Sequence, residues 1–147
     1  MNWEKFDKNV DLEGIKEDIK EADENSGNYE EIPTGEYEVE ITKLELSESK
    51  SGKPMVTAWF KILEGKYTGQ HIFYNQVITE GFQISMMKRF INSMDAETEI
   101  EFNSYAKLER DLEKVFEEVK DSSDFLLEYG KTKKGFPTYT IQDVYDK

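Results

Sequence analysis

The chain has 147 residues, of which 37% are hydrophobic and 35% charged, and its formal net charge is −13. This length predicts a single domain, and the negative charge argues against non-specific attraction to bulk nucleic acid or anionic membranes. The absence of cysteine excludes disulfides, cysteine-ligated zinc and thiol nucleophiles. The lack of a signal-peptide pattern or a long apolar run predicts a cytoplasmic protein with no membrane partner.

Residues 1–31 predict an acidic helical extension. They hold 11 acidic residues and 4 lysines. Apolar residues recur there at helical spacing: Trp3, Phe6, Val10, Ile15, Ile19 and Ala22. A polar, glycine-containing turn at residues 25–28 ends the pattern. We therefore divide the chain into an acidic helical N-terminal extension, residues 1–31, and a domain over residues 32–147.

The first expected strand begins after Pro33 and Gly35. From Glu36 to Ile41, acidic and apolar residues alternate as in a strand with one buried face. The alternation slips at Thr42-Lys43, which indicates a β-bulge. A bent, bulged first strand is what a small barrel needs in order to close.

A second strand is expected from Met55 to Leu63 and a third from Gln70 to Ile78. In the second strand, every other residue is apolar and should face the core, so that Trp59 and Lys61 point outward. The two faces of the third strand are similar in character. The pattern therefore leaves open which of them is exposed.

Two helices and a hairpin complete the expected domain. The first helix spans Phe82–Met94, and most of its circumference should be buried. The second helix spans Tyr105–Asp121 and is capped by Ser104. The final strands span about Phe125–Lys131 and Phe136–Val144. Three strands, a helical insertion and two strands follow the order of the five-stranded Greek-key barrel called the OB-fold. The sequence thus predicts an OB-fold-like β-barrel with helices (α+β), the helical insertion lying between strands 3 and 4.

Several turn segments resemble those of a family of small bacteriophage proteins. These segments are Ile32–Tyr37, Ser49–Pro54 and Gly65–Gln70, with the closing element at Gly135–Ile141. The family is encoded among phage replication and recombination genes and is similar to single-stranded DNA-binding proteins of the OB-fold type. The resemblance covers about residues 28–145. It implies a location in the cytoplasm of a bacterial host and single-stranded DNA as a partner, with phage recombinase or replication proteins and further copies of the chain as other candidates.

Lysines gather where an OB-fold places its ligand, across strands two and three and in the flanking loops. They are Lys50, Lys53, Lys61, Lys66, Lys131, Lys133 and Lys134. A flexible point charge can follow a phosphate backbone without requiring a base sequence. The alternative is that these lysines only solubilise the turns.

Aromatic residues in the same segments are candidate stacking platforms for bases. They are Trp59, Tyr67, Phe73, Tyr74, Phe136 and Tyr139. A base on such a ring contributes roughly 1–3 kcal/mol and any base can stack. Core packing is the competing interpretation for each ring. Trp59 is the exception, because Thr57 and Lys61 share its face.

No catalytic or metal-binding motif is recognisable. His71 is the only histidine, and no triad order, HExxH motif, P-loop or EF-hand pattern can be assembled. We therefore expect a protein that is not an enzyme and needs no cofactor or metal. The predicted function is sequence-independent single-stranded DNA binding in phage replication or recombination. The alternative is an acidic phage inhibitor that resembles DNA and binds a basic host defence protein.

Overall fold

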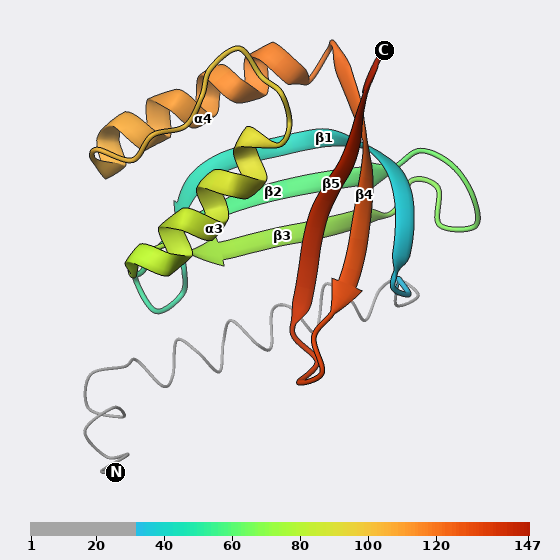
Figure 1. The fold of residues 1–147 in the computed structure, drawn as a ribbon, viewed down its shortest axis with the longest axis horizontal. Coiled ribbons are helices and arrows are strands. Elements are labelled where there is room, and N and C mark those ends of the chain that lie inside the picture. Colours follow the sequence, from blue (N-terminus) through green and yellow to red (C-terminus); the bar gives the residue numbers. More distant parts are fainter. Residues whose placement is uncertain (1–31) are drawn as a thin grey trace.

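In the computed structural model, which describes residues 32–147, the chain forms one antiparallel sheet and two helices (Figure 1). The strands are β1 (Gly35–Glu48), β2 (Pro54–Ile62), β3 (His71–Val77), β4 (Ser123–Lys131) and β5 (Pro137–Asp146). The helices are α3 (Gly81–Asn92) and α4 (Tyr105–Val119), and both lie between β3 and β4 in the chain. The expected helical extension, residues 1–31, lies outside the described residues.

The expected closed barrel is wrong, because the sheet is open. Its strand order is β3-β2-β1-β4-β5, so β3 and β5 are edges, and no backbone ladder joins them in residues 32–147. Aromatic side chains connect these edges instead. The ring of Tyr74 on β3 stacks on Phe90 of α3, with centroids 4.3 Å apart, and meets Tyr139 of β5 edge-on at 5.1 Å. Bulky rings thus join the edges where a barrel would have backbone pairing.

β1 is long enough to pair with two strands. Its first part, Gly35–Val39, pairs with β4, and Val39–Glu48 pairs with β2. The register with β2 shifts between Ile41 and Lys43, which confirms the predicted bulge. A bulge bends a strand and increases its twist. The bent β1 therefore serves both halves of the sheet, and β4 and β5 run across β1–β3 in Figure 1.

The core is built on the inward residues of β2. As expected, four alternate residues are completely buried: Val56, Ala58, Phe60 and Ile62. The ring of Phe60 meets Phe90 of α3 and Phe125 of β4 edge-on. The structure also gives the orientation of β3, which the pattern left open. Ile72 and Tyr74 face the core, so the alternate residues of β3 face outward.

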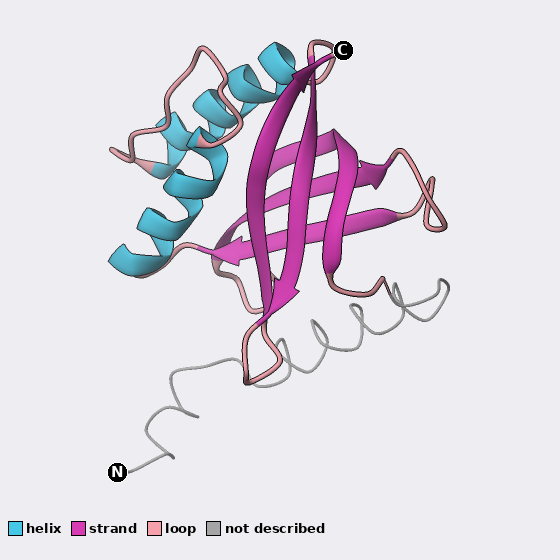
Figure 2. Ribbon diagram, turned by 45° about the vertical axis from the view of Figure 1, so that its right-hand side comes forward, coloured by secondary structure: helices cyan, strands magenta, loops and turns pink. Residues whose placement is uncertain are grey.

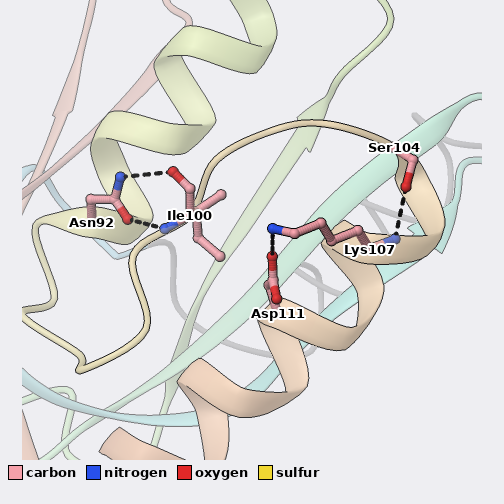
Figure 3. A network of polar contacts seen from close by, with 5 residues as sticks. All are labelled: Asn92, Ile100, Ser104, Lys107 and Asp111. Atoms are coloured by element: carbon pink, nitrogen blue, oxygen red, sulfur yellow. Dashed lines mark hydrogen bonds and ion pairs between the residues drawn. The ribbon is translucent and has the colours of Figure 1, made fainter.

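α4 packs against β1 through an apolar stripe. Its buried apolar residues are Leu108, Leu112, Val115 and Val119. The predicted cap is confirmed, because the Ser104 hydroxyl oxygen accepts a 3.1 Å hydrogen bond from the Lys107 backbone N–H (Figure 3). Both helices lie on the same side of the sheet (Figure 2). The outward face of β1–β3 is therefore formed by strands alone in the described part of the chain.

α3 is less buried than the sequence predicted. Its core-facing residues are Met87, Phe90 and Ile91. Phe82 and Met86, however, are 66% and 51% exposed. The helix packs against the edge strands β3 and β5 on one side, and its exposed side carries Ser85 and Arg89 beside these two apolar residues.

Side chains fix the connection between α3 and α4. The Asn92 amide oxygen accepts a 2.7 Å hydrogen bond from Ile100 N–H, and its nitrogen donates at 3.2 Å to the Ile100 carbonyl (Figure 3). The backbone and hydroxyl of Thr98 donate to the Glu118 carboxylate at 2.9 and 2.7 Å. These bonds satisfy backbone groups that have no helix or strand partner. They hold Ile100 in the core, where its side chain is fully buried.

Candidate nucleic-acid interface

The outer face of β1–β3, opposite the core, carries residues in cross-strand rows. The register places Lys43 opposite Trp59, and Trp59 opposite Phe73. In a neighbouring row, Lys61 lies opposite His71. Because opposite residues of antiparallel strands contact each other, these rows bring together basic and aromatic groups from three strands.

Trp59, His71 and Phe73 form a cluster that we call the aromatic platform. The Trp59 ring meets Phe73 edge-on at 5.5 Å and His71 at 6.2 Å between centroids. The rings of His71 and Phe73 are nearly parallel at 6.1 Å. Trp59 is 37% exposed, whereas the other two are half-buried. Two rings thus support one accessible indole, which can stack with a planar group.

Lys43 covers part of the aromatic platform. Its Nζ lies 4.2 Å from the centroid of the Trp59 ring, a cation–π contact, and 3.1 Å from a carboxylate oxygen of Glu45. Sequence reasoning did not identify Lys43 as a site residue. The signal was nevertheless present, because an antiparallel hairpin centred on Ser51 places Lys43 opposite Trp59.

Lys61 supplies a second positive charge beside the platform. Burial lowers the pKa of His71, and the charge of Lys61 lowers it further, whereas Glu40 acts in the opposite direction. Glu40 is itself paired with Lys147, whose Nζ lies 2.9 Å from its carboxylate. His71 is therefore neutral at pH 7 and contributes a ring rather than a charge.

Acidic residues gather at the end of the outer face where β1 pairs with β4. The charge of Glu64 is the main cause of the raised pKa of Glu38, and Asp124 adds to it. Like charges this close repel one another and would repel a phosphate at this end. We therefore exclude this acidic end of the face from the candidate interface.

The predicted loop lysines come from three separate connections, β1–β2, β2–β3 and β4–β5, and Lys131 is the last residue of β4. These connections lie at the periphery of the sheet (Figure 2). Lys50 is exposed and Lys53 half-buried in the β1–β2 turn. Lys66 lies in the β2–β3 turn, 5.5 Å from the ring centroid of Tyr67. Exposed residues of the β4–β5 segment complete the set: Lys131, Lys133, Lys134 and Phe136. Of the predicted site residues, the structure brings Trp59, Lys61 and Phe73 together.

Four of the predicted rings are not on the platform: the exposed Phe136 and three tyrosines that pack against other rings. Tyr74 is only 4% exposed, so it is not available for stacking, because β3 turns it inward. Tyr139 is half-buried and packs against Tyr74 and Phe90. Tyr67 is half-buried and meets Tyr37 edge-on at 6.4 Å. These three tyrosines serve packing at the edges and ends of the sheet.

Within residues 32–147, no three histidine, aspartate or glutamate side chains are grouped so that they could hold a metal ion. In the same range, no helix is long and apolar enough to cross a membrane.

A family model described as a protein of unknown function, DUF669, matches residues 17–124. The chain belongs to this DUF669 family. No curated protein matches the chain. The DUF669 match includes the whole aromatic platform with Lys43 and Lys61, whereas the β4–β5 turn and its lysines lie beyond it. The platform is thus part of the family domain.

Proposed function

We propose that this DUF669 protein binds single-stranded DNA on the outer face of β1–β3. The observation that carries the proposal is the aromatic platform, in which Trp59 is 37% exposed and flanked by two lysines. Base stacking on such a ring contributes roughly 1–3 kcal/mol and accepts any base. The neighbouring ammonium groups of Lys43 and Lys61 would neutralise phosphates on either side of the stacked base.

The interface favours a single strand over a duplex. Stacking on Trp59 requires a base whose face is accessible, and the bases of a duplex are stacked on one another. Recognition in the major groove usually uses an inserted helix or ribbon, but in the described residues both helices lie on the other side of the sheet (Figure 2). The net charge of −13 further weakens attraction to duplex DNA.

Lys43 would change partners when a strand binds. Without DNA its ammonium lies over the Trp59 ring and near Glu45. A base that stacks on the exposed indole would replace this contact, and the flexible lysine could then reach the adjoining phosphate. Binding thus exchanges a cation–π contact for a stacked base and an ion pair.

The biological setting that we propose is phage DNA replication or recombination. The resemblance of the turn segments to phage single-stranded DNA-binding proteins supports this setting. In it, the protein would coat or hold a single strand without making or breaking bonds. Recombinase or replication proteins of the phage would be its protein partners.

A second candidate is the acidic inhibitor of a basic host protein. The observation in its favour is the exposed carboxylate row along α4, at Glu109, Glu113 and Glu117. A row of negative charge can attract a basic protein surface. The two functions use different faces of the molecule, because the aromatic platform lies on β1–β3. Substitutions on the platform therefore distinguish them.

Fluorescence titration of the full chain with oligo-dT, with a duplex control and a salt series, tests the proposal. Trp3→Phe leaves Trp59 as the only tryptophan, and we expect oligo-dT to quench its emission. In this background, Trp59→Ala should raise the Kd for labelled oligo-dT by about 5- to 150-fold, which corresponds to roughly 1–3 kcal/mol.

Phe82→Ala is the matched control, because Phe82 is an exposed ring on α3 away from the outer face of β1–β3. It should leave the Kd unchanged. Equal effects of the two substitutions, or equal affinity for duplex and single strand, would contradict the proposal. Binding to no DNA at all would favour the inhibitor.

A further inference from the structure

A polar row adjoins the aromatic platform on the side toward the β1–β2 turn. There the register places Thr57 opposite Asn75. Asn75 lies two residues after Phe73 and therefore on the same face of β3, about 7 Å further along the strand. Its side chain is exposed, whereas Thr57 is only 6% exposed. Asn75 is thus the accessible polar group nearest in register to Phe73 on this side.

A hydrogen bond fixes which end of the Asn75 amide faces outward. The Thr57 hydroxyl donates to the Asn75 amide oxygen at 3.1 Å. A hydroxyl has one hydrogen, so the Thr57–Asn75 bond leaves the Ser47 hydrogen for the 3.0 Å contact between the Thr57 and Ser47 hydroxyls. That contact then competes with the longer, 3.3 Å hydrogen bond from the Ser47 hydroxyl to the Met55 carbonyl oxygen. The chain of donors therefore runs from Ser47 through Thr57 to Asn75. The amide oxygen is engaged, and its NH₂ group is left as the donor toward a ligand.

We propose that Asn75 donates this hydrogen bond to a base stacked on the aromatic platform, so that the site prefers keto bases to amino bases. The inference rests on the proposed function, single-stranded DNA binding by the same face. Thymine and guanine present carbonyl oxygens at the positions where cytosine and adenine present NH₂ groups. A donor that faces a carbonyl gains a hydrogen bond, whereas a donor that faces an NH₂ group gains none.

The Thr57 bond also predicts that adenine is not preferred. An asparagine that recognises adenine uses its oxygen and its nitrogen together, in a bidentate pair. Here the oxygen is already engaged by a buried hydroxyl. Stacking remains open to every base, so the preference is a bias within general binding. One neutral hydrogen bond corresponds to about a three- to tenfold difference in affinity.

The test compares oligo-dU with oligo-dC, which carry a carbonyl and an NH₂ group, respectively, at position 4 of the base. The neighbouring ring nitrogen, position 3, changes with it from a donor in uracil to an acceptor in cytosine. We expect the unmodified chain to bind oligo-dU about three- to tenfold more tightly. Asn75→Ala should bring the ratio close to one. Asn75→Asp keeps an oxygen for Thr57 and replaces the outward NH₂ with a second oxygen, so it should shift the preference toward oligo-dC.

Thr57→Val tests whether the Thr57 hydroxyl fixes the orientation of the Asn75 amide. This change removes the hydrogen-bond donor without changing the size of the side chain, so the Asn75 amide can turn over. The preference for oligo-dU over oligo-dC should therefore fall, although Asn75 itself is still present. Thr140→Val, a change of the same type at an exposed position of β5, should leave the ratio unchanged. A melting curve for each variant shows that it is folded. Because the side chains of asparagine and aspartate have the same shape, Asn75→Asp can be measured even if Asn75→Ala does not fold.

The outcomes separate the two proposals. If the unmodified chain and Asn75→Ala bind oligo-dU and oligo-dC with the same ratio, the base-reading role of Asn75 is overturned and single-stranded DNA binding stands. If the chain binds neither oligonucleotide, the proposed function fails, and the inference fails with it.

Discussion

The hydroxyl of Tyr139 on β5 donates a 2.7 Å hydrogen bond to the backbone carbonyl of Phe73 on β3. These residues are 66 positions apart in the chain and lie on the two edges of the open sheet. The ring of Phe73 points outward and belongs to the aromatic platform. The same residue therefore supports the candidate DNA interface with its side chain and the contact between the sheet edges with its backbone.

Tyr139→Phe should destabilise the fold by about 1 kcal/mol, because it removes this hydrogen bond but keeps the ring. Urea denaturation measures the free energy of unfolding. Tyr145→Phe, on the same strand but with an exposed ring, is the matched control and should have little effect. A Tyr139→Phe variant as stable as the control would show that the edge contact adds nothing to stability.

Tyr74, which is buried, and Tyr139, which is half-buried, should make the fold sensitive to alkaline pH. Burial raises the pKa of both Tyr74 and Tyr139 above their ordinary value. In the unfolded chain the phenols ionise at about pH 10. Below that pH they are neutral in the folded and unfolded states alike, and the fold keeps its full stability. Above it, the unfolded state loses protons that the folded state keeps, and stability falls with rising pH by up to about 1.4 kcal/mol per pH unit for each tyrosine.

Urea midpoints measured on either side of pH ~10 test this expectation. Tyr74→Phe should reduce the alkaline slope, because the unfolded state then has one phenol fewer to ionise. Tyr105→Phe, at a half-exposed position on α4, serves as the comparison. An alkaline slope that is the same in the Tyr74→Phe variant would contradict the role of burial.

Asn92→Ala should destabilise the fold by roughly 1–3 kcal/mol, because the backbone N–H of Ile100 loses its partner at a buried position. Thermal unfolding followed by circular dichroism measures the change. Asn103→Ala, an exposed asparagine in the same connection, is the control. Similar melting temperatures for the two variants would mean that water replaces the Asn92 amide without cost.

Features governed by neighbouring residues could be predicted from the sequence. The alternation in β2, the Ser104 cap and the bulge before Lys43 each leave a signal within a few residues. Whether the sheet closes depends on pairing between β3 and β5, which are separated by two helices. No local pattern shows that Tyr74 and Tyr139 would join these edges through their rings instead of through backbone pairing.

The candidate site was predictable only in part, for a similar reason. The outward direction of Trp59 follows from the apolar residues on either side of it. Lys43 and His71 join it through cross-strand register, which depends on where each turn is centred. Phe82 was expected in the core because apolar residues occupy most of the circumference of its helix, but the structure exposes it.

The β4–β5 turn should contribute charge to the DNA path. Tyr139 attaches β5 to Phe73 of the platform, and Lys134 lies five residues before Tyr139, at most about 17 Å along the chain. Replacing Lys133 and Lys134 by Ala removes up to two phosphate contacts. The log–log salt dependence of oligo-dT binding should therefore flatten by up to roughly 1.4 units, at about 0.7 for each contact on a single strand.

The matched control for this turn replaces two exposed basic residues of α4, Arg110 and Lys114, by Ala. It changes the net charge by the same amount but lies on the helical side of the sheet. The control should lower affinity slightly at low salt through the overall field, with a nearly unchanged salt slope because no phosphate contact is lost. If both double variants flatten the slope equally, the turn lysines act only through net charge. The path of the strand would then be limited to the platform, where Lys43 and Lys61 remain to contact its phosphates.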